Sequence, residues 1–260
     1  MGLIGNLIYW PISSKDKVEK YQEIIRDEEW EAIEQYIPVA SKFLDVGCGA
    51  GYSLMKAKNN RKCEVVGIDP EPGAHGVGRY NGLKTENTEI LQGFSENLPF
   101  EDEQFDVVYS SHVLEHVNDE QKSLEEMKRV LKQDGTLIIG MPTAAMAGIN
   151  LFSQVFFLTH IRIYRFLKSI ITLKFNYPIK NIFILGSHSK PRAKYIWYDL
   201  KHYKISNWEK IVGGVFNIGK IITPCFYPYP DFVQFFKMKR NFKYSSSVFF
   251  ICKLKKGNAF

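Results

Sequence analysis

Cysteine is scarce in this chain of 260 residues, and its placement argues against a structural zinc site. The four cysteines are Cys48, Cys63, Cys225 and Cys252, and they lack the paired spacing of zinc ligands. Two of them fall in stretches predicted as core strands, so we expect reduced, buried thiols and a cytoplasmic protein. Residues 1–12 are apolar but have neither a basic start nor a small-residue cleavage site, so we expect no signal peptide.

Acidic residues are nearly missing from the second part of the chain. Residues 151–260 hold 19 Lys and Arg but only three acids, whereas residues 1–150 hold 25 acids against 15 Lys and Arg. The net charge of +6 therefore arises entirely from the C-terminal part. A solvated basic surface would have this composition, but so severe a shortage of acids favours an anionic partner.

Three glycines at alternate positions follow a short apolar run. Phe43–Val46 has the composition of a buried strand, and Gly47, Gly49 and Gly51 come directly after it. A sharp turn out of a strand needs positive φ angles, and a ligand lying on the backbone leaves no room for Cβ atoms. Strand, glycine loop and helix form the layout of a nucleotide-type site at the carboxyl edge of a parallel sheet. The G-x-G-x-G spacing is not that of a dinucleotide site, which makes a dehydrogenase the least favoured class.

A second apolar run, Cys63–Ile68, ends in Asp69 and Pro70. A carboxylate at this strand tip, about two dozen residues after the glycine loop begins, is placed to accept hydrogen bonds from both hydroxyls of a ribose. The alternative is that Asp69 and Pro70 only end the strand in a turn.

Five later segments follow in a family-specific order and spacing. They are Asn97–Phe100, Phe105–Tyr109, His112–Val117, Met127–Leu131 and Gly135–Ile139. With these segments, residues 30–142 resemble the class I S-adenosylmethionine (SAM)-dependent methyltransferases, in the small-molecule branch called methyltransferase type 11. The resemblance implies an α/β fold with a doubly wound, mostly parallel seven-stranded sheet. It also implies an antiparallel C-terminal edge hairpin and a helical insertion or cap after the fifth strand.

The resemblance implies that SAM is the cofactor and S-adenosylhomocysteine the product. The residues expected to bind the cofactor lie at the strand tips: Asp45, Gly47, Cys48, Gly49, Gly51, Asp69, Pro70, Ser95, Glu96 and Ser110. Phe94 departs from the family pattern, because relatives usually have an acid there for the adenine amino group. Either Glu96 takes that role, or the backbone N–H of Ser95 and apolar packing hold the adenine.

Histidines are the candidates for proton transfer. Methyl transfer is an in-line displacement in which the protein aligns the acceptor and excludes water, and a hydroxyl acceptor must also lose a proton. His112, at the end of the fourth strand, is the first choice for this base and His202 the second, although either could form only a polar wall. His116 has a chemical role or packs under the cofactor. No metal-ligand cluster stands out, so we expect no metal.

The composition of the chain and the extent of the family resemblance divide it into four parts. Residues 1–40 form an N-terminal cap helix region, 41–142 the SAM-binding core and 143–200 a basic amphipathic insertion or lid. Residues 201–260 return to the core with the last helix and the antiparallel strands. The sequence carries no signal for an oligomeric state.

The insertion contains a stretch with two alternative roles. Residues 149–175 are rich in Phe, Ile and Leu, and His160–Leu173 is predicted as a basic amphipathic helix. Asn150 and Gln154 argue against a transmembrane span. Such a helix either packs as a lid over the substrate cleft or lies in a membrane interface, which would place the protein at the inner face of the membrane. The basic loop of residues 188–194 could hold a phosphate or carboxylate.

We therefore expect a SAM-dependent methyltransferase that acts by O-methylation on a small or a lipid- or glycan-linked, anionic acceptor. One alternative keeps the reaction but uses the basic C-terminal half as a phosphate track for tRNA or rRNA. Another is a catalytically silent SAM-binding scaffold, which Phe94 and the glycine-rich segment 71–82 favour.

Overall fold

The computed structural model of the protein describes residues 14–78, 88–156, 158–172, 178–183, 185–189, 193–227, 238–240 and 244–255. Residues 1–13 of the expected cap, 79–82 of the glycine-rich segment, 173–175 of the insertion and 190–192 of the basic loop lie outside the described residues.

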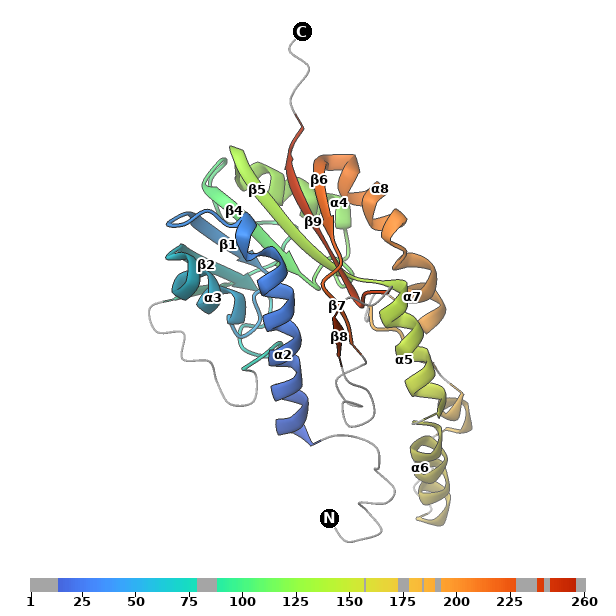
Figure 1. The fold of residues 1–260 in the computed structure, drawn as a ribbon. Helices are drawn as coiled ribbons and strands as arrows, with labels where there is room; N and C mark the ends of the chain where they lie inside the picture. The colour runs from blue at the N-terminus through green and yellow to red at the C-terminus, as the bar shows by residue number, and fades with distance from the viewer. Residues whose placement is uncertain are drawn as a thin grey trace.

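Seven strands form one mixed sheet in the order β3-β2-β1-β4-β5-β9-β6 (Figure 1). They are β1 (Lys42–Val46), β2 (Glu64–Asp69), β3 (Glu89–Gln92), β4 (Phe105–Ser111), β5 (Leu131–Pro142), β6 (Phe216–Ile222) and β9 (Ser247–Leu254). β1 to β5 pair in parallel, whereas β9 runs antiparallel to both β5 and β6. The predicted doubly wound sheet with an antiparallel edge hairpin is confirmed. β7 (Cys225–Phe226) and β8 (Lys239–Arg240) form a separate small ribbon.

Helices connect the strands and cover both faces of the sheet. They are α2 (Lys15–Ile33), α3 (Tyr52–Arg61), α4 (Glu120–Val130), α5 (Ala144–Phe156), α6 (Thr159–Ile171), α7 (Ile196–His202) and α8 (Ile205–Val215), with 3-10 turns η1 (Glu34–Tyr36) and η2 (Ile179–Ile182). α4 begins directly after Asp119, whose carboxylate caps the helix by accepting a hydrogen bond from the Lys122 N–H at 3.0 Å.

The alternation of side chains along the strands separates two hydrophobic cores. Phe43 and Tyr109 face α2 and α3, and both rings pack edge-on against Trp30 of α2. Leu44 points to the other face, where α4 and α8 bury Trp208. Burial on both faces explains why these strands read as continuous apolar runs. β1 pairs with β2 on one side and with β4 on the other, so the strand order reverses at β1. Sheets of this kind bind ligands at the carboxyl ends of the strands where the order reverses.

α5 and α6 leave the end of β5 and extend beyond the sheet (Figure 1). α6 matches the predicted basic amphipathic helix of the insertion. Among the described residues, no single helix has the length and apolar character needed to cross a membrane. α5 and α6 meet that test only together, as a pair bent by 44°.

Candidate functional site

The glycine loop after β1 has the backbone geometry that its sequence predicts. Gly47, Gly49 and Gly51 adopt φ angles of +80°, +53° and +87°. A Cβ atom at Gly47 would lie 2.1 Å from the Val113 side chain, and one at Gly49 would lie 2.6 Å from the His75 carbonyl oxygen. Only glycine is therefore compatible with both the backbone conformation and the space at these positions.

The loop is attached to the tip of β2 through Asp69. The N–H groups of Gly47 and Cys48 donate to the Ile68 carbonyl at 2.7 and 3.2 Å. The buried Asp69 carboxylate accepts the Gly49 N–H on one oxygen and the Glu71 N–H on the other, both at 2.8 Å. Each oxygen retains a lone pair, so the carboxylate still has capacity for ribose hydroxyls. This loop and Asp69 fit a nucleoside cofactor.

The glycine-rich segment after β2 lies against the same loop. The Ala50 N–H donates to the His75 carbonyl and the Gly73 N–H to the Gly49 carbonyl, both at 3.0 Å. Residues 71–78 form turns and bends rather than a helix. The N–H of Gly78 donates to Glu19 of α2 at 2.9 Å, so this segment connects α2 to the cofactor loop.

Asp45, on β1, is buried beneath the loop and accepts a hydrogen bond from the Ser53 hydroxyl. Burial raises the pKa of its carboxyl to about 7, with a further rise from nearby Asp69 and an opposing effect from Ser53. The protonated form of Asp45 therefore predominates in the folded protein only below about pH 7.

We expect Asp45→Asn to remove a pH dependence of stability. Because folding raises the Asp45 pKa, the native state binds this proton more tightly, and wild-type stability falls as the pH rises from about 4 to 7. Relative to Asp45→Asn, the wild type should lose about 2–3 kcal/mol of unfolding free energy between pH 5 and pH 8. Urea unfolding at both pH values measures this difference, and Asp134→Asn, at an exposed position of β5, is the control. Parallel pH profiles of wild type and Asp45→Asn would contradict the assignment.

The segment expected at the adenine has a polar network of its own. The Ser95 hydroxyl lies 2.9 Å from the Ser123 hydroxyl and donates to Glu96 at 3.1 Å. The other Glu96 oxygen accepts the Asn118 N–H at 3.1 Å. Phe94 is exposed. The roles of Ser95 and Glu96 at the adenine stay predictions.

Ser110 and His112 lie at the carboxyl end of β4, beside the glycine loop. The buried Ser110 hydroxyl donates to the Val46 carbonyl at 2.9 Å and so joins the tips of β4 and β1. His112 has a left-handed backbone, with φ of +57°, and its N–H donates to the Gly140 carbonyl at 2.8 Å. A strained non-glycine backbone of this kind is common at functional sites.

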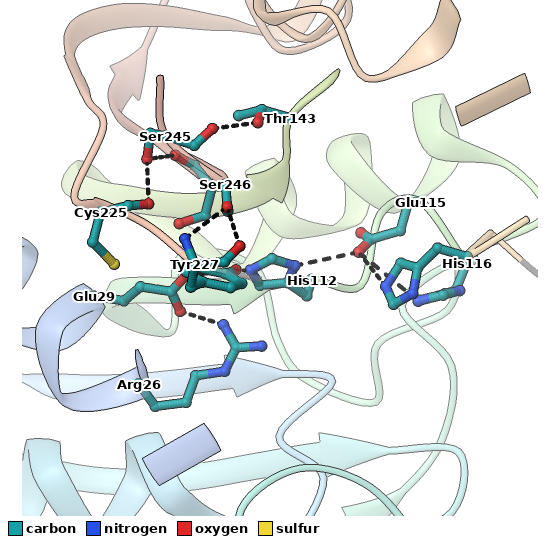
Figure 2. A network of polar contacts seen from close by, with 12 residues as sticks. Arg26, Glu29, His112, Glu115, His116, Thr143, Cys225, Tyr227, Ser245 and Ser246 are labelled. Carbon is teal, nitrogen blue, oxygen red and sulfur yellow. Dashed lines mark hydrogen bonds and ion pairs between the residues drawn. The ribbon is translucent and has the colours of Figure 1, made fainter. Parts of the chain in front are cut away.

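The His112 imidazole lies between two carboxylates (Figure 2). Its Nε2 is 3.5 Å from Glu29 of α2, and its Nδ1 is 3.6 Å from Glu115. Burial and the Arg26 charge lower the pKa of His112, but the two carboxylates outweigh them and the pKa is raised. His112 is thus a stronger base than an ordinary histidine.

Glu29 is a site residue that the sequence analysis missed. It is 1% exposed, pairs with Arg26, and accepts a hydrogen bond from the Tyr227 hydroxyl at 3.2 Å. Burial raises the pKa of its carboxyl, but Arg26 and His112 outweigh burial and hold the pKa at about 2. The available signal was helical spacing, because Glu29 falls four residues after Ile25 and so lies within the apolar stripe of α2.

Glu115 is completely buried and surrounded by imidazoles. Its Oε1 lies 3.6 Å from His112 Nδ1, 3.8 Å from His116 Nε2 and 4.0 Å from His188 Nε2. Burial raises the pKa of the Glu115 carboxyl, but the three histidines outweigh burial and lower it. Burial lowers the pKa of His188 to about 4, which favours its neutral form. The fold therefore brings His112 and His116 together and adds His188 from the basic loop.

His202 belongs to a different group of contacts. Its Nε2 lies 3.0 Å from Glu120 at the start of α4, and its ring stacks on Tyr198 and meets Trp208 edge-on. These contacts join α7 to α4 and α8. The role of His202 as an alternative base stays a prediction.

Comparison with known proteins agrees with this geometry. Residues 44–139 match the family model described as a methyltransferase domain. The chain is 36% identical over 108 residues to the demethylmenaquinone methyltransferase of Staphylococcus saprophyticus, covering 40% of this chain and 46% of that protein. It is 32% identical over 111 residues to a ubiquinone/menaquinone biosynthesis C-methyltransferase of Campylobacter jejuni, with the same two coverages. The chain spans about half the length of the curated relatives it matches.

The fold has solved counterparts. A SAM-dependent methyltransferase from Thermotoga maritima, described as a possible histamine N-methyltransferase, superposes with a TM-score of 0.53 at 18% identity and covers 92% of this chain and 91% of that one. The sheet, the glycine loop and Asp69 define a class I SAM-dependent methyltransferase fold. Within this fold, residues 44–139 are the part that is similar to a methyltransferase domain.

Proposed function

We propose that the protein is a methyltransferase that transfers the methyl group of SAM to a small, lipid-linked acceptor. The observation that carries the acceptor class is the exposed apolar face of α5 and α6. We call it the α5–α6 face, and its exposed apolar residues are Phe152, Val155, Phe156, Ile163, Leu167, Ile170 and Ile171. The names of the relatives, which include quinone methyltransferases, support the same class.

The cofactor half of the proposal is supported by the glycine loop and Asp69. SAM supplies an electrophilic methyl group when bound, and the residues of the chain hold and orient it. We infer that the glycine loop receives the methionyl part and that the Asp69 carboxylate accepts the ribose hydroxyls. Ser110 and His112 then border the space for the acceptor.

The α5–α6 face suits a lipid surface better than an RNA. Phe156 is 65% and Ile171 80% exposed, while Arg165 and Lys168 are exposed on the same helix as Ile171. Apolar side chains next to basic ones match the boundary between acyl chains and anionic head groups. A phosphate track would need basic residues without this apolar content.

The α5–α6 face is connected to the histidine cluster. The Gln154 side chain of α5 donates to the Gly186 carbonyl and accepts the Gly186 N–H, both at 2.8 Å. Gly186 lies two residues before His188. Gln154 therefore joins α5 to the segment that carries His188, which supports a lid-like insertion.

His112 is the residue we propose for proton removal. An acceptor hydroxyl becomes nucleophilic when His112 accepts its proton, and Glu29 and Glu115 stabilise the imidazolium that results. This supports O-methylation. The names of the quinone relatives instead favour methylation of a ring carbon, where a base is also needed to remove a proton after transfer.

The test is methyl transfer from radiolabelled SAM into a total lipid extract. We expect label in the organic phase, and fragmentation of the product separates an oxygen-bound from a carbon-bound methyl group. The double variant Phe156→Asp and Ile171→Asp should raise the apparent KM for the lipid acceptor at least about tenfold. This factor corresponds to about 1.4 kcal/mol of binding free energy. Val39→Asp, at an exposed apolar residue away from the α5–α6 face, should leave KM unchanged. Label only in RNA or in water-soluble products would refute the lipid acceptor, and SAM binding without transfer to any extract would favour the silent scaffold.

A further inference from the structure

Glu115, His116 and His188 place one ligand atom each within 4.8 Å of one another. Glu115 and His116 lie in the turn between β4 and α4, and His188 comes from the segment between η2 and α7. Glu115 is completely buried, whereas the His116 and His188 side chains are 35% and 26% exposed. The cluster therefore has a buried end at the carboxylate and an open end at the imidazoles.

The Glu115 carboxylate lacks the partners that a buried charge needs. Among the described residues, neither of its oxygens has a hydrogen-bond partner. The three imidazoles approach to 3.6–4.0 Å, beyond the length of a hydrogen bond. A buried charged group without hydrogen bonds is strongly unfavourable, and a bound cation would satisfy it.

We propose that Glu115, His116 and His188 bind a divalent transition metal ion, with Zn²⁺ as the best match. Two imidazole nitrogens and one carboxylate oxygen form a donor set that Zn²⁺ prefers. Tetrahedral ligands of Zn²⁺ lie about 3.3–3.4 Å apart, given bonds of about 2.0–2.1 Å. The distances from Glu115 Oε1 to the two imidazoles, 3.8 and 4.0 Å, need to contract by about half an ångström.

His112 acts on this site as a positioning residue. It bridges Glu115 and Glu29 at 3.6 and 3.5 Å, and so connects the metal-binding carboxylate to α2. Partners of this kind orient metal ligands and raise affinity.

Three protein ligands leave one coordination position open. An open position is typical of catalytic zinc, where it takes water or substrate. In this protein it would receive the oxygen of the acceptor and lower the pKa of an acceptor hydroxyl. This role rests on the proposed methyl transfer, but metal binding itself does not. The sequence predicted no metal because His188 lies far along the chain from Glu115 and His116.

The experiment is calorimetric titration of Zn²⁺ into the full chain after treatment with a chelator. Co²⁺ serves as a second probe, because its visible spectrum reports the coordination number. We expect one equivalent of Zn²⁺ and a four-coordinate Co²⁺ spectrum. Glu115→Gln and His188→Gln should each weaken Zn²⁺ binding about 100-fold or more, since direct ligands contribute more than the 10–100-fold typical of their outer partners.

His75→Gln is the matched control, because His75 and Glu71 form an exposed pair at 3.6 Å with the same chemistry. It should bind Zn²⁺ like the wild type. His188→Gln changes a partly exposed loop residue, and its thermal unfolding without metal verifies that the variant folds. Absence of stoichiometric binding by the wild type, or wild-type affinity in both site variants, would overturn the proposal. SAM titrations of the metal-free and metal-loaded protein separate the proposed metal site from the proposed methyl transfer. If the protein binds SAM but no Zn²⁺, only the metal site is refuted.

Discussion

Asp69→Ala should weaken the binding of SAM and of S-adenosylhomocysteine about 100-fold or more. The Asp69 carboxylate is buried and holds the Gly49 and Glu71 N–H groups at 2.8 Å. Its remaining lone pairs face the expected ribose, and hydrogen bonds to a charged group contribute about 1.5–3 kcal/mol each. Loss of two such bonds corresponds to about 3 kcal/mol or more, which is at least about 100-fold in affinity. Isothermal titration calorimetry with both ligands measures the effect.

Two controls make this result specific. Asp134→Ala removes an exposed carboxylate from β5 and should leave SAM affinity unchanged. Asp69→Asn retains one acceptor for the Gly49 N–H, and we expect an intermediate loss of about tenfold, since a neutral hydrogen bond is about half as strong as a charged one. If Asp69→Ala binds SAM with wild-type affinity, Asp69 does not contact the cofactor. No binding of either ligand by the wild type would contradict the methyltransferase proposal as a whole.

Glu29→Ala should lower the free energy of unfolding by about 3 kcal/mol at neutral pH. Glu29 is almost fully buried and pairs with Arg26 while accepting the Tyr227 hydroxyl, with His112 Nε2 at 3.5 Å (Figure 2). Its removal leaves a guanidinium without a partner and a buried hydroxyl without an acceptor, which costs much more than an exposed pair. Urea denaturation followed by circular dichroism measures the change.

The pH dependence of the Glu29 effect has a defined sign. Because folding lowers the Glu29 pKa to about 2, its contribution is fully present above the unfolded value and is lost as the pH falls toward about 2. The difference between wild type and Glu29→Ala should therefore shrink at pH 3. Glu125→Ala is the control, since Glu125 forms an exposed pair with Lys128 at 3.6 Å and should cost less than about 0.5 kcal/mol. A similar cost for both variants would show that the buried network adds little to stability.

Much of the core was predictable because its signals are local. The glycines after β1 depend on the conformation of a few consecutive residues, and the structure shows the expected positive φ angles. The hydrogen bond from the Gly49 N–H to Asp69 was not predicted, and ribose binding by Asp69 stays a prediction. The sheet order follows from apolar runs that alternate with helices, together with the resemblance of five segments to one family. The same reasoning predicted α6 correctly as a basic amphipathic helix.

The environment of the histidines was not predictable, because the groups that define it come from distant parts of the chain. The sequence gives no signal that Tyr227, 198 residues away, donates to Glu29, or that the buried Glu115 faces His188. The sequence offers both His112 and His202 as candidate bases, and only the fold shows that His202 contacts Glu120 whereas His112 contacts two other carboxylates.

The sequence by itself determined the methyltransferase fold and the conformation of the glycine loop, since backbone conformation and burial are set by neighbouring residues and their periodicity. Only the tertiary structure decided the raised pKa of His112, the partners of Glu29 and the grouping of Glu115, His116 and His188. Electrostatic interactions depend on distances of a few ångströms between atoms, and only the packing of α2, the β4–α4 turn and the insertion sets those distances.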